Sequence, residues 1–205
     1  MTKMPSNMSR PPLILASTSA SRRSLLAGAG LTFTCEAAHI DERAIEADLT
    51  NMQPDQIALR LSEEKAREVS RRFPHAVVIG ADQTLSLGSQ SFHKPASEDD
   101  ARRQLQRLRG ATHRLNSGVA CARNGEILYG HVAIADMTMR LFSDAFLDRY
   151  MEIAGRNVLS SVGCYQLEGP GIQLFDRIQG DYFTILGLPL LPLLSYLRTL
   201  DVIDA

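Results

Sequence analysis

A cluster of small hydroxyl side chains and two arginines directly follows an apolar run near the start of the chain. Positions 13–23 are LILASTSASRR. Backbone N–H groups at a helix N-terminus bind anions, phosphate in particular, and arginine adds paired hydrogen bonds to phosphate oxygens. The glycines and the lysine of a Walker A loop are absent. The pattern fits a phosphate site that uses Arg22 and Arg23, and it fits equally an ordinary helix cap followed by two solvated arginines.

One carboxylate and two lysines are further candidates for phosphate chemistry. Asp82 ends the apolar run HAVVIGAD, and α/β sheets bind ligands at the carboxyl ends of their strands. A turn or cap aspartate is the common alternative. Lys65 lies at the edge of an apolar helical stripe, where a lysine often only extends its ammonium group to solvent. Lys94 precedes a proline just before a helix. Together these residues indicate metal-assisted phosphoryl chemistry.

The elements that must position these residues predict an α/β fold with a mixed, twisted sheet flanked by helices. Strand–helix alternation comes first, and an antiparallel pair joined by the turn signal RNG (123–125) follows. The expected strands cover 13–16, 31–38, 75–82, 112–122, 127–140 and 172–178. The expected helices begin at Ser19 or Ser21, Pro54, Ser97, Ser143 and Leu188, and they end near 29, 73, 110, 153 and 200. No linker interrupts the chain, so its two parts should share a cleft.

Bulk properties restrict the class of protein. The 205 residues are 44% hydrophobic and 22% charged, with a net charge of −1, so we expect a globular domain with no general attraction to nucleic acid or anionic membrane. The three cysteines form no CxxC pair, the N-terminus has no apolar signal segment, and the longest apolar stretch is too short to span a bilayer. We therefore expect a cytoplasmic protein with a disordered tail over 1–12 and one catalytic domain over 13–205.

Six short stretches provide a family resemblance that covers about Leu13 to Leu197. In order they are LASTSASRRSLL, IDE (40–42), EKA (64–66), IGADQT, KPAS with the spaced residues up to SGV, and GDYFTILGLPL. The set resembles the signatures of the Maf-like nucleoside triphosphate pyrophosphatases. The resemblance implies two lobes around a deep active-site cleft, as in the related inosine triphosphate pyrophosphatases. It also implies hydrolysis of a nucleoside triphosphate to monophosphate and pyrophosphate with Mg²⁺ or Mn²⁺, in nucleotide-pool sanitation, and it makes a homodimer plausible.

The resemblance also implies roles for individual residues. Asp82 matches the catalytic carboxylate that accepts the proton from water, and Glu42 matches the acid that helps it to hold the metal. The triphosphate-binding positions fall on Ser17, Arg22, Lys65 and Lys94. Of these, Lys94 is also counted with the catalytic group. Asp41, beside Glu42, is interpreted as a turn or cap residue and not as part of the site.

Three further positions, Ser21, Gln83 and Glu168, bear on the base. Gln83 with Glu168 resembles the subgroup that acts on 7-methyl-GTP rather than the one that prefers dTTP and UTP. A carboxylate at Glu168 can accept hydrogen bonds from the N1–H and N2–H₂ edge of guanine. Ser21 stands where that subgroup has tryptophan, so it offers no stacking partner for a cationic, methylated guanine. Tyr165 could replace that tryptophan, or it could be an ordinary core tyrosine, so the base preference stays open.

Two functions of different class fit this sequence. One is a nucleotide-pool enzyme, and the other is a non-catalytic regulator of cell division and septum formation that binds a nucleotide on the same fold. The presence of Asp82, Glu42, Lys65 and Lys94 favours the enzyme, because a pure binding protein has no use for a carboxylate at a metal site. Such a binding protein should also tolerate Asp82→Asn.

Overall fold

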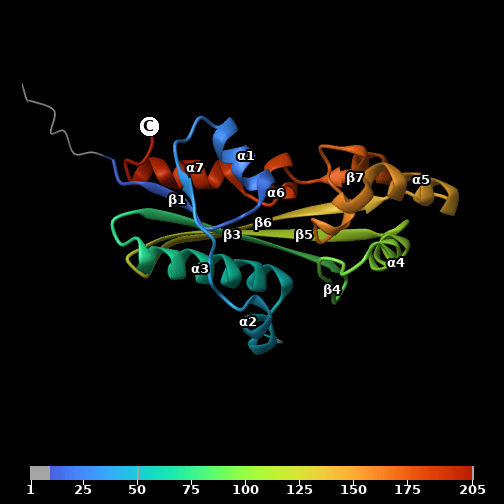
Figure 1. The fold of residues 1–205 in the computed structure, drawn as a ribbon, viewed down its shortest axis with the longest axis horizontal. Coiled ribbons are helices and arrows are strands. Elements are labelled where there is room, and N and C mark those ends of the chain that lie inside the picture. The colour runs from blue at the N-terminus through green and yellow to red at the C-terminus, as the bar shows by residue number, and fades with distance from the viewer. Residues whose placement is uncertain (1–9, 50, 205) are drawn as a thin grey trace, which may run out of the picture.

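The computed structural model describes residues 10–49 and 51–204 as a seven-stranded mixed sheet with helices on both faces (Figure 1). The expected α/β fold is confirmed. The strands are β1 (Leu13–Leu15), β2 (Thr34–Cys35), β3 (Val77–Leu87), β4 (Gln90–Phe92), β5 (Thr112–Arg123), β6 (Glu126–Met139) and β7 (Phe175–Gln179). The helices are α1 (Ala20–Gly28), α2 (Glu42–Asp48), α3 (Pro54–Arg72), α4 (Glu98–Leu108), α5 (Asp144–Ala154), α6 (Tyr182–Ile185) and α7 (Leu190–Thr199), with 3₁₀ turns η1 (Gly155–Leu159) and η2 (Pro170–Leu174).

The sheet has the order β2-β1-β3-β5-β6-β7, and β4 pairs separately with β3. Strands β1, β2 and β3 are parallel, whereas the remaining pairs are antiparallel. In Figure 1, α3 lies on one face of the sheet, and α1 and α7 lie on the other. Both faces of the central strands are therefore covered, which explains their long apolar runs.

Local sequence signals explain where several elements begin and turn. Serine side chains cap three helices: Ser19 caps α1, Ser97 caps α4 and Ser143 caps α5. The caps of α4 and α5 were expected, and for α1 the structure selects Ser19 over Ser21. Between β5 and β6, Asn124 and Gly125 both have positive φ (51° and 83°). A two-residue hairpin turn of this kind favours an Asn-Gly pair, so the RNG signal is confirmed.

Other expectations were wrong in detail. The strand expected over 31–38 is reduced to Thr34–Cys35. The run that was expected to end at Asp82 continues to Leu87, because β5 pairs with it from Val78 to Ser86. Helix α2 was missed because it buries none of its residues and therefore has no apolar stripe.

The segment before β7 was also expected to be extended throughout, from 172 to 178. Residues Pro170–Leu174 form the 3₁₀ turn η2, and the strand starts only at Phe175. The turn is tight, because a Cβ atom at Gly171 would lie 2.5 Å from the Gln166 carbonyl oxygen. Proline and glycine at the start of this segment favour the turn over a strand.

Among the described residues, four hydrophobic clusters pack on this one sheet, and two of them are much larger than the others. The first contains Leu85 and Leu115 and lies under α4 and α5. The second contains Ile79 and Val119 and lies under α1 and α7. Strands β3 and β5 contribute to both of the larger clusters, so these two clusters are joined through the same pair of strands.

One edge of β3 is only partly paired. Strand β1 pairs with residues 77–79, β4 pairs with residues 85–87, and β5 occupies the opposite edge. Among the described residues, no strand pairs with 80–84 on the first edge. We call this segment the β3 gap. It lies directly beyond the carboxyl end of β1, where open α/β sheets bind their ligands.

Two glycines let α3 approach the sheet beside this gap. A Cβ atom at Gly80 would lie 2.1 Å from the Ser62 carbonyl oxygen, and one at Gly118 would lie 2.5 Å from the Ala58 carbonyl oxygen. Gly118 is also the register partner of Asp82 on β5. Side chains alternate along a strand, so Gly80 and Asp82 face the same helix, and the close approach of α3 brings its side chains to Asp82.

Little of the expected N-terminal tail falls within the described residues. Residues 1–9 lie outside them, and at Pro12 the carbonyl oxygen accepts a hydrogen bond from the Val77 N–H at 2.9 Å. No helix in the described part of the chain is long and apolar enough to cross a membrane.

Candidate active site

Lys65, Asp82 and Glu42 form an ion-pair cluster beside the β3 gap. The Lys65 ammonium group contacts a carboxylate oxygen of Asp82 and lies 3.0 Å from Glu42 Oε1. Only 11% of the Lys65 side chain and 13% of the Asp82 side chain are exposed, compared with 52% for Glu42. The alternative interpretation, that Lys65 only extends its ammonium group to solvent, is therefore wrong, because this group is held against β3.

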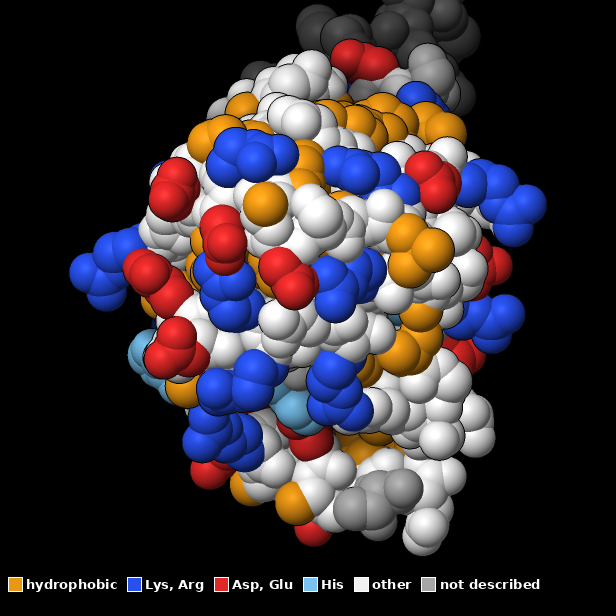
Figure 2. Space-filling model, turned by 90° about the vertical axis from the view of Figure 1, so that its right-hand side faces the viewer, with side chains coloured by type: hydrophobic (Ala, Val, Ile, Leu, Met, Phe, Trp, Pro, Cys, Tyr) orange, Lys and Arg blue, Asp and Glu red, His pale blue; other side chains and the backbone are white. Residues whose placement is uncertain are grey.

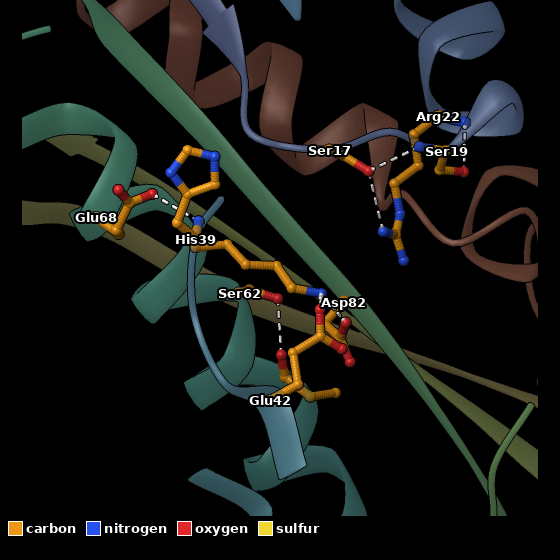
Figure 3. A network of polar contacts seen from close by, with 10 residues as sticks. Ser17, Ser19, Arg22, His39, Glu42, Ser62, Glu68 and Asp82 are labelled. Atoms are coloured by element: carbon orange, nitrogen blue, oxygen red, sulfur yellow. Dashed lines mark hydrogen bonds and ion pairs between the residues drawn. The ribbon is translucent and has the colours of Figure 1, made fainter. Parts of the chain in front are cut away.

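Three elements deliver these groups. Lys65 comes from α3, Asp82 from the middle of β3, and Glu42 from the first turn of α2. The Asp41 side chain caps α2 by accepting a hydrogen bond from the Ala44 N–H at 3.1 Å, which confirms its interpretation as a cap residue. Figure 3 shows Glu42 directed toward Asp82.

Arg22 and Ser17 lie at the start of α1. Arg22 Nε donates to the Gly187 carbonyl oxygen at 2.8 Å, and one terminal nitrogen donates to Ser17 Oγ at 3.4 Å. Ser17 Oγ also accepts from the Ser19 N–H at 3.1 Å, as Figure 3 shows. The guanidinium is thus fixed at one end by a carbonyl, and its remaining N–H groups are available to an anion.

The charge of Arg22 interacts with the two carboxylates of the ion-pair cluster. Burial lowers the pKa of Arg22, and the negative charges of Asp82 and Glu42 oppose that shift. Ser17 follows Ala16, whose N–H donates to the Ile79 carbonyl oxygen at 2.7 Å. The start of α1 therefore lies at the same gap in β3 as Lys65, and the two cations approach it from different helices.

Arg22 differs from two arginines, one in α4 and one at its C-terminal cap, that are paired with carboxylates of α5. Figure 2 shows basic and acidic side chains interspersed over the end of the molecule formed by α4 and α5. There Arg102 pairs with Asp148 at 2.6 Å, and Arg109 pairs with Asp144 at 2.7 Å. Arg22 has no carboxylate within ion-pair distance in the part of the chain that the structure describes. Of these arginines, it is the one best placed to bind phosphate.

The residues expected to contact the base lie in two places. Ser21 Oγ donates to Glu168 Oε1 at 3.5 Å, so α1 and the loop at 168 meet. The Gln83 amide nitrogen lies 2.8 Å from Ser117 Oγ and 3.1 Å from the Thr184 carbonyl oxygen. Gln83 thus ties β3 to β5 and α6, and only its oxygen is left for a ligand. Tyr165 is 6% exposed in the hydrophobic core, which settles it as a core residue.

Lys94 is the expected site residue that the structure does not bring into the cluster. Its side chain is exposed and forms no ion pair among the described residues. Its neighbour His93 lies 3.7 Å from Glu46, on α2. Lys94 is therefore placed close to the helix that bears Glu42, without a contact to Asp82 or Lys65.

Glu46 was missed by sequence reasoning. Burial raises its pKa, and the charges of Asp82 and Glu42 raise it further, whereas His93 and Lys65 act in the opposite direction. The available signal was its spacing of four residues from Glu42, which places both carboxylates on one face of a helix. That signal required α2, which had not been predicted.

The carboxylates fit a metal that arrives with a substrate. No group of three or more His, Cys, Asp or Glu side chains that could hold a metal ion occurs within residues 10–49 and 51–204. However, the carboxylates of Glu42 and Asp82 both contact the same cation, the Lys65 ammonium group, so their oxygens lie close together. Mg²⁺ is commonly held by one or two carboxylates together with substrate phosphates. Glu42 and Asp82 are consistent with a site of this kind, in which the substrate supplies the remaining ligands.

Sequence comparisons find a family and close relatives among known proteins. The family model described as Maf-like protein matches residues 12–200. A 7-methyl-GTP pyrophosphatase of Rhizobium johnstonii is 57% identical, over 95% of this chain and 98% of the relative. Another from Brucella abortus is 56% identical, over 94% and 98%. A nucleoside triphosphate pyrophosphatase of Bradyrhizobium diazoefficiens is 54% identical, over 95% and 96%.

The comparison with solved structures finds a remote likeness. A HAM1 protein from Coxiella burnetii aligns with a TM-score of 0.38 and 12% identity, over 63% of this chain and 73% of that chain. The family match spans every residue of the site, from Ser17 to Glu168. On the strength of that match and of these relatives, the chain belongs to the Maf-like protein family.

Proposed function

We propose that this protein hydrolyses nucleoside triphosphates to the monophosphate and pyrophosphate, with a preference for guanine-type bases such as 7-methylguanine. The names of the relatives support this activity. The observation that carries it is the convergence of the Asp82–Lys65–Glu42 cluster and the Ser17–Arg22 pair on the β3 gap. This convergence combines a carboxylate for the attacking water with cations for the phosphates.

The chain's cations bind and orient the triphosphate. Arg22 holds phosphate oxygens through the N–H groups that Ser17 and Gly187 do not use, and Lys65 supplies a second positive charge from the other side of the gap. Charges that are fixed before the reaction stabilise the leaving pyrophosphate without reorganisation. The contact with Asp82 fixes the charge of Lys65, and the hydrogen bonds to Gly187 and Ser17 fix the charge of Arg22.

The proposed step is an in-line attack of water on the α-phosphorus. A new bond forms between the water oxygen and the α-phosphorus, and the bond to the oxygen that bridges the α- and β-phosphates breaks. Pyrophosphate leaves with that electron pair, and Asp82 accepts one proton from the water. A divalent cation bound with the substrate would lower the pKa of the water and neutralise phosphate charge, and Glu42 and Asp82 are the residues that would hold it.

Glu168 is the residue proposed to recognise the base. Its carboxylate lies against Ser21 of α1, the same helix whose first turn carries Arg22. A nucleotide whose phosphates bind Arg22 therefore extends its base toward Glu168. The carboxylate can accept hydrogen bonds from the N1–H and N2–H₂ groups of guanine, and it repels the carbonyl groups of a pyrimidine.

A product assay tests the activity. The purified protein is incubated with GTP, 7-methyl-GTP, dTTP or UTP and with Mg²⁺ or Mn²⁺, and the products are separated. We expect monophosphate and pyrophosphate in equal amounts, fastest from the guanine nucleotides, and no turnover in excess chelator. Orthophosphate as the first product would contradict attack at the α-phosphorus, whereas full activity in chelator would remove the metal from the proposal and leave the hydrolysis intact.

A further inference from the structure

A buried histidine–tyrosine pair lies in the larger hydrophobic cluster. His113 Nε2, on β5, is 2.7 Å from the Tyr165 hydroxyl, and His113 is fully buried. Its ring also packs against Phe175, at 6.0 Å between centroids. The other ring nitrogen, Nδ1, has no hydrogen-bond partner among the described residues. A buried nitrogen without a partner is unfavourable for folding. The contact with the Tyr165 hydroxyl is thus the one side-chain hydrogen bond that His113 forms among the described residues.

Tyr165 anchors the start of the loop that carries Glu168. Its ring meets Phe175 edge-on at 4.8 Å, and a Cβ atom at Gly163 would lie 2.3 Å from the same ring. Its backbone N–H donates to Ser161 Oγ at 3.1 Å, and its carbonyl accepts from that hydroxyl at 2.7 Å. The ring and the backbone of Tyr165 are thus both fixed.

The loop has little freedom between Tyr165 and Gly171. The Gly169 N–H donates to the Gln166 carbonyl oxygen at 3.2 Å, and a Cβ atom at Gly171 would lie 2.5 Å from that oxygen. On the preceding side, the Tyr150 hydroxyl donates to the Cys164 carbonyl oxygen at 2.9 Å. Because these contacts close the loop, we expect a shift of the Tyr165 ring to displace Glu168, three residues further on.

We infer that His113 is a positioning residue for base recognition, which acts through Tyr165 to fix the loop that holds Glu168 against Ser21. This inference rests on the proposed function. It adds to Glu168, the residue proposed to contact the base, a second residue, His113, that fixes the position of Glu168. Among the described residues, His113 forms no hydrogen bond with the phosphate-binding residues Ser17, Arg22 and Lys65. Its loss should therefore affect recognition of the base and leave phosphate binding intact.

Three substitutions test this assignment. His113→Phe and Tyr165→Phe each remove the polar contact and keep an aromatic ring, whereas the amide of His113→Gln reaches the position of Nε2 and can still bond to Tyr165. We expect the two phenylalanine variants to lower kcat/KM for 7-methyl-GTP by about tenfold, mostly through KM, with UTP changed by less than about twofold. His113→Gln should recover most of the loss. The double phenylalanine variant should be no worse than either single one, because both remove the same contact.

An activity-independent measurement accompanies the kinetics. Amide hydrogen exchange over residues 162–169 should be faster in both phenylalanine variants and close to wild type in His113→Gln. Equal losses on all nucleotides, or unchanged selectivity and exchange, would overturn the assignment. If the wild type hydrolyses no triphosphate, the proposed function fails, and the exchange data alone then decide whether His113 fixes the loop. Should His113→Phe not fold, Tyr165→Phe carries both measurements.

Discussion

The two ends of the candidate site are built from different kinds of structure. At the phosphate end, Lys65 and Asp82 are almost fully covered and come from the longest helix and from a central strand. At the base end, Glu168 is an exposed side chain on an irregular loop, and its contact with Ser21 is a single hydrogen bond of 3.5 Å. The first set is held by the sheet, and the second is held by a loop that packs on it.

This difference corresponds to what each end must recognise. Phosphates are the same in every nucleoside triphosphate, so fixed charges on a rigid scaffold serve all substrates. Bases differ, and loops tolerate sequence change better than the elements they connect. A chain with this division can change its base preference through Glu168 and its neighbours without rebuilding the β3 gap.

The largest expected effect comes from Asp82→Asn, at the phosphate end. The change keeps the shape of the side chain but removes the charge next to Lys65, so kcat should fall by about 10² or more for every nucleotide. Single-turnover kinetics and thermal unfolding measure chemistry and fold separately. Asp41→Asn is the matched control, because asparagine caps a helix as well as aspartate does. A folded Asp82→Asn variant with near-normal turnover would place the catalytic group elsewhere.

Arg22→Ala should be the next largest change, and it should not depend on the base. Loss of a charge-assisted hydrogen bond costs about 1.5–3 kcal/mol, so kcat/KM should fall by roughly tenfold to a hundredfold for GTP, 7-methyl-GTP, dTTP and UTP alike. Arg23→Ala, at the exposed neighbouring position, is the control and should stay close to wild type. A loss confined to guanine nucleotides would show that Arg22 belongs to the base end.

Glu168→Gln should produce a smaller and selective loss. One acceptor becomes a donor that faces the N–H groups of guanine, a mismatch of about 1–3 kcal/mol. We expect kcat/KM for guanine nucleotides to fall by about tenfold, with dTTP and UTP unchanged or improved. Competition assays with mixed nucleotides give the ratio directly. A wild type that prefers dTTP or UTP, or a variant that loses all substrates equally, would refute this role for Glu168.

The smallest effect concerns stability and the anchor of the base end. Burial lowers the pKa of His113 to about 4 in the folded protein, below the ordinary value of about 6.5 in the unfolded chain. The unfolded state therefore binds the proton first, and stability is lost as the pH falls from about 6.5 toward 4. Between pH 7 and 5.5 the wild type should lose about 1 kcal/mol more of its free energy of unfolding than His113→Phe does. Urea unfolding at both pH values tests this, and parallel curves for the two proteins would contradict it.

Much of the fold could be predicted because its long elements carry strong periodic signals. The amphipathic α3, the two hairpin strands and the serine caps all have local signatures. The family resemblance named Lys65, Asp82 and Glu42 together, and the structure places them in contact. Their meeting depends on the close packing of α3 against Gly80 and Gly118, which is a tertiary property that no local pattern contains.

The base end was less predictable for the same reason. Nothing near Tyr165 in the sequence indicates that its hydroxyl meets His113, 52 positions away. Helix α2 has no buried face to produce a periodic signal, so Glu46 was not recognised. Gln83 binds Ser117 on the neighbouring strand and two carbonyl oxygens, of Thr184 and Ile185, about a hundred positions away in the sequence, and no local pattern indicates the latter contacts.

The β3 gap has a consequence for how molecules of this protein behave toward one another. A stretch of sheet edge without a neighbouring strand can pair with a strand of another molecule and begin aggregation, and charged side chains are a common means of preventing this. Residues 80–84 form such a stretch, and an ammonium group and two carboxylates stand beside it. We therefore expect the side chains proposed for catalysis to hinder strand pairing at this edge as well, so that variants lacking these charges should be examined for aggregation as well as for activity.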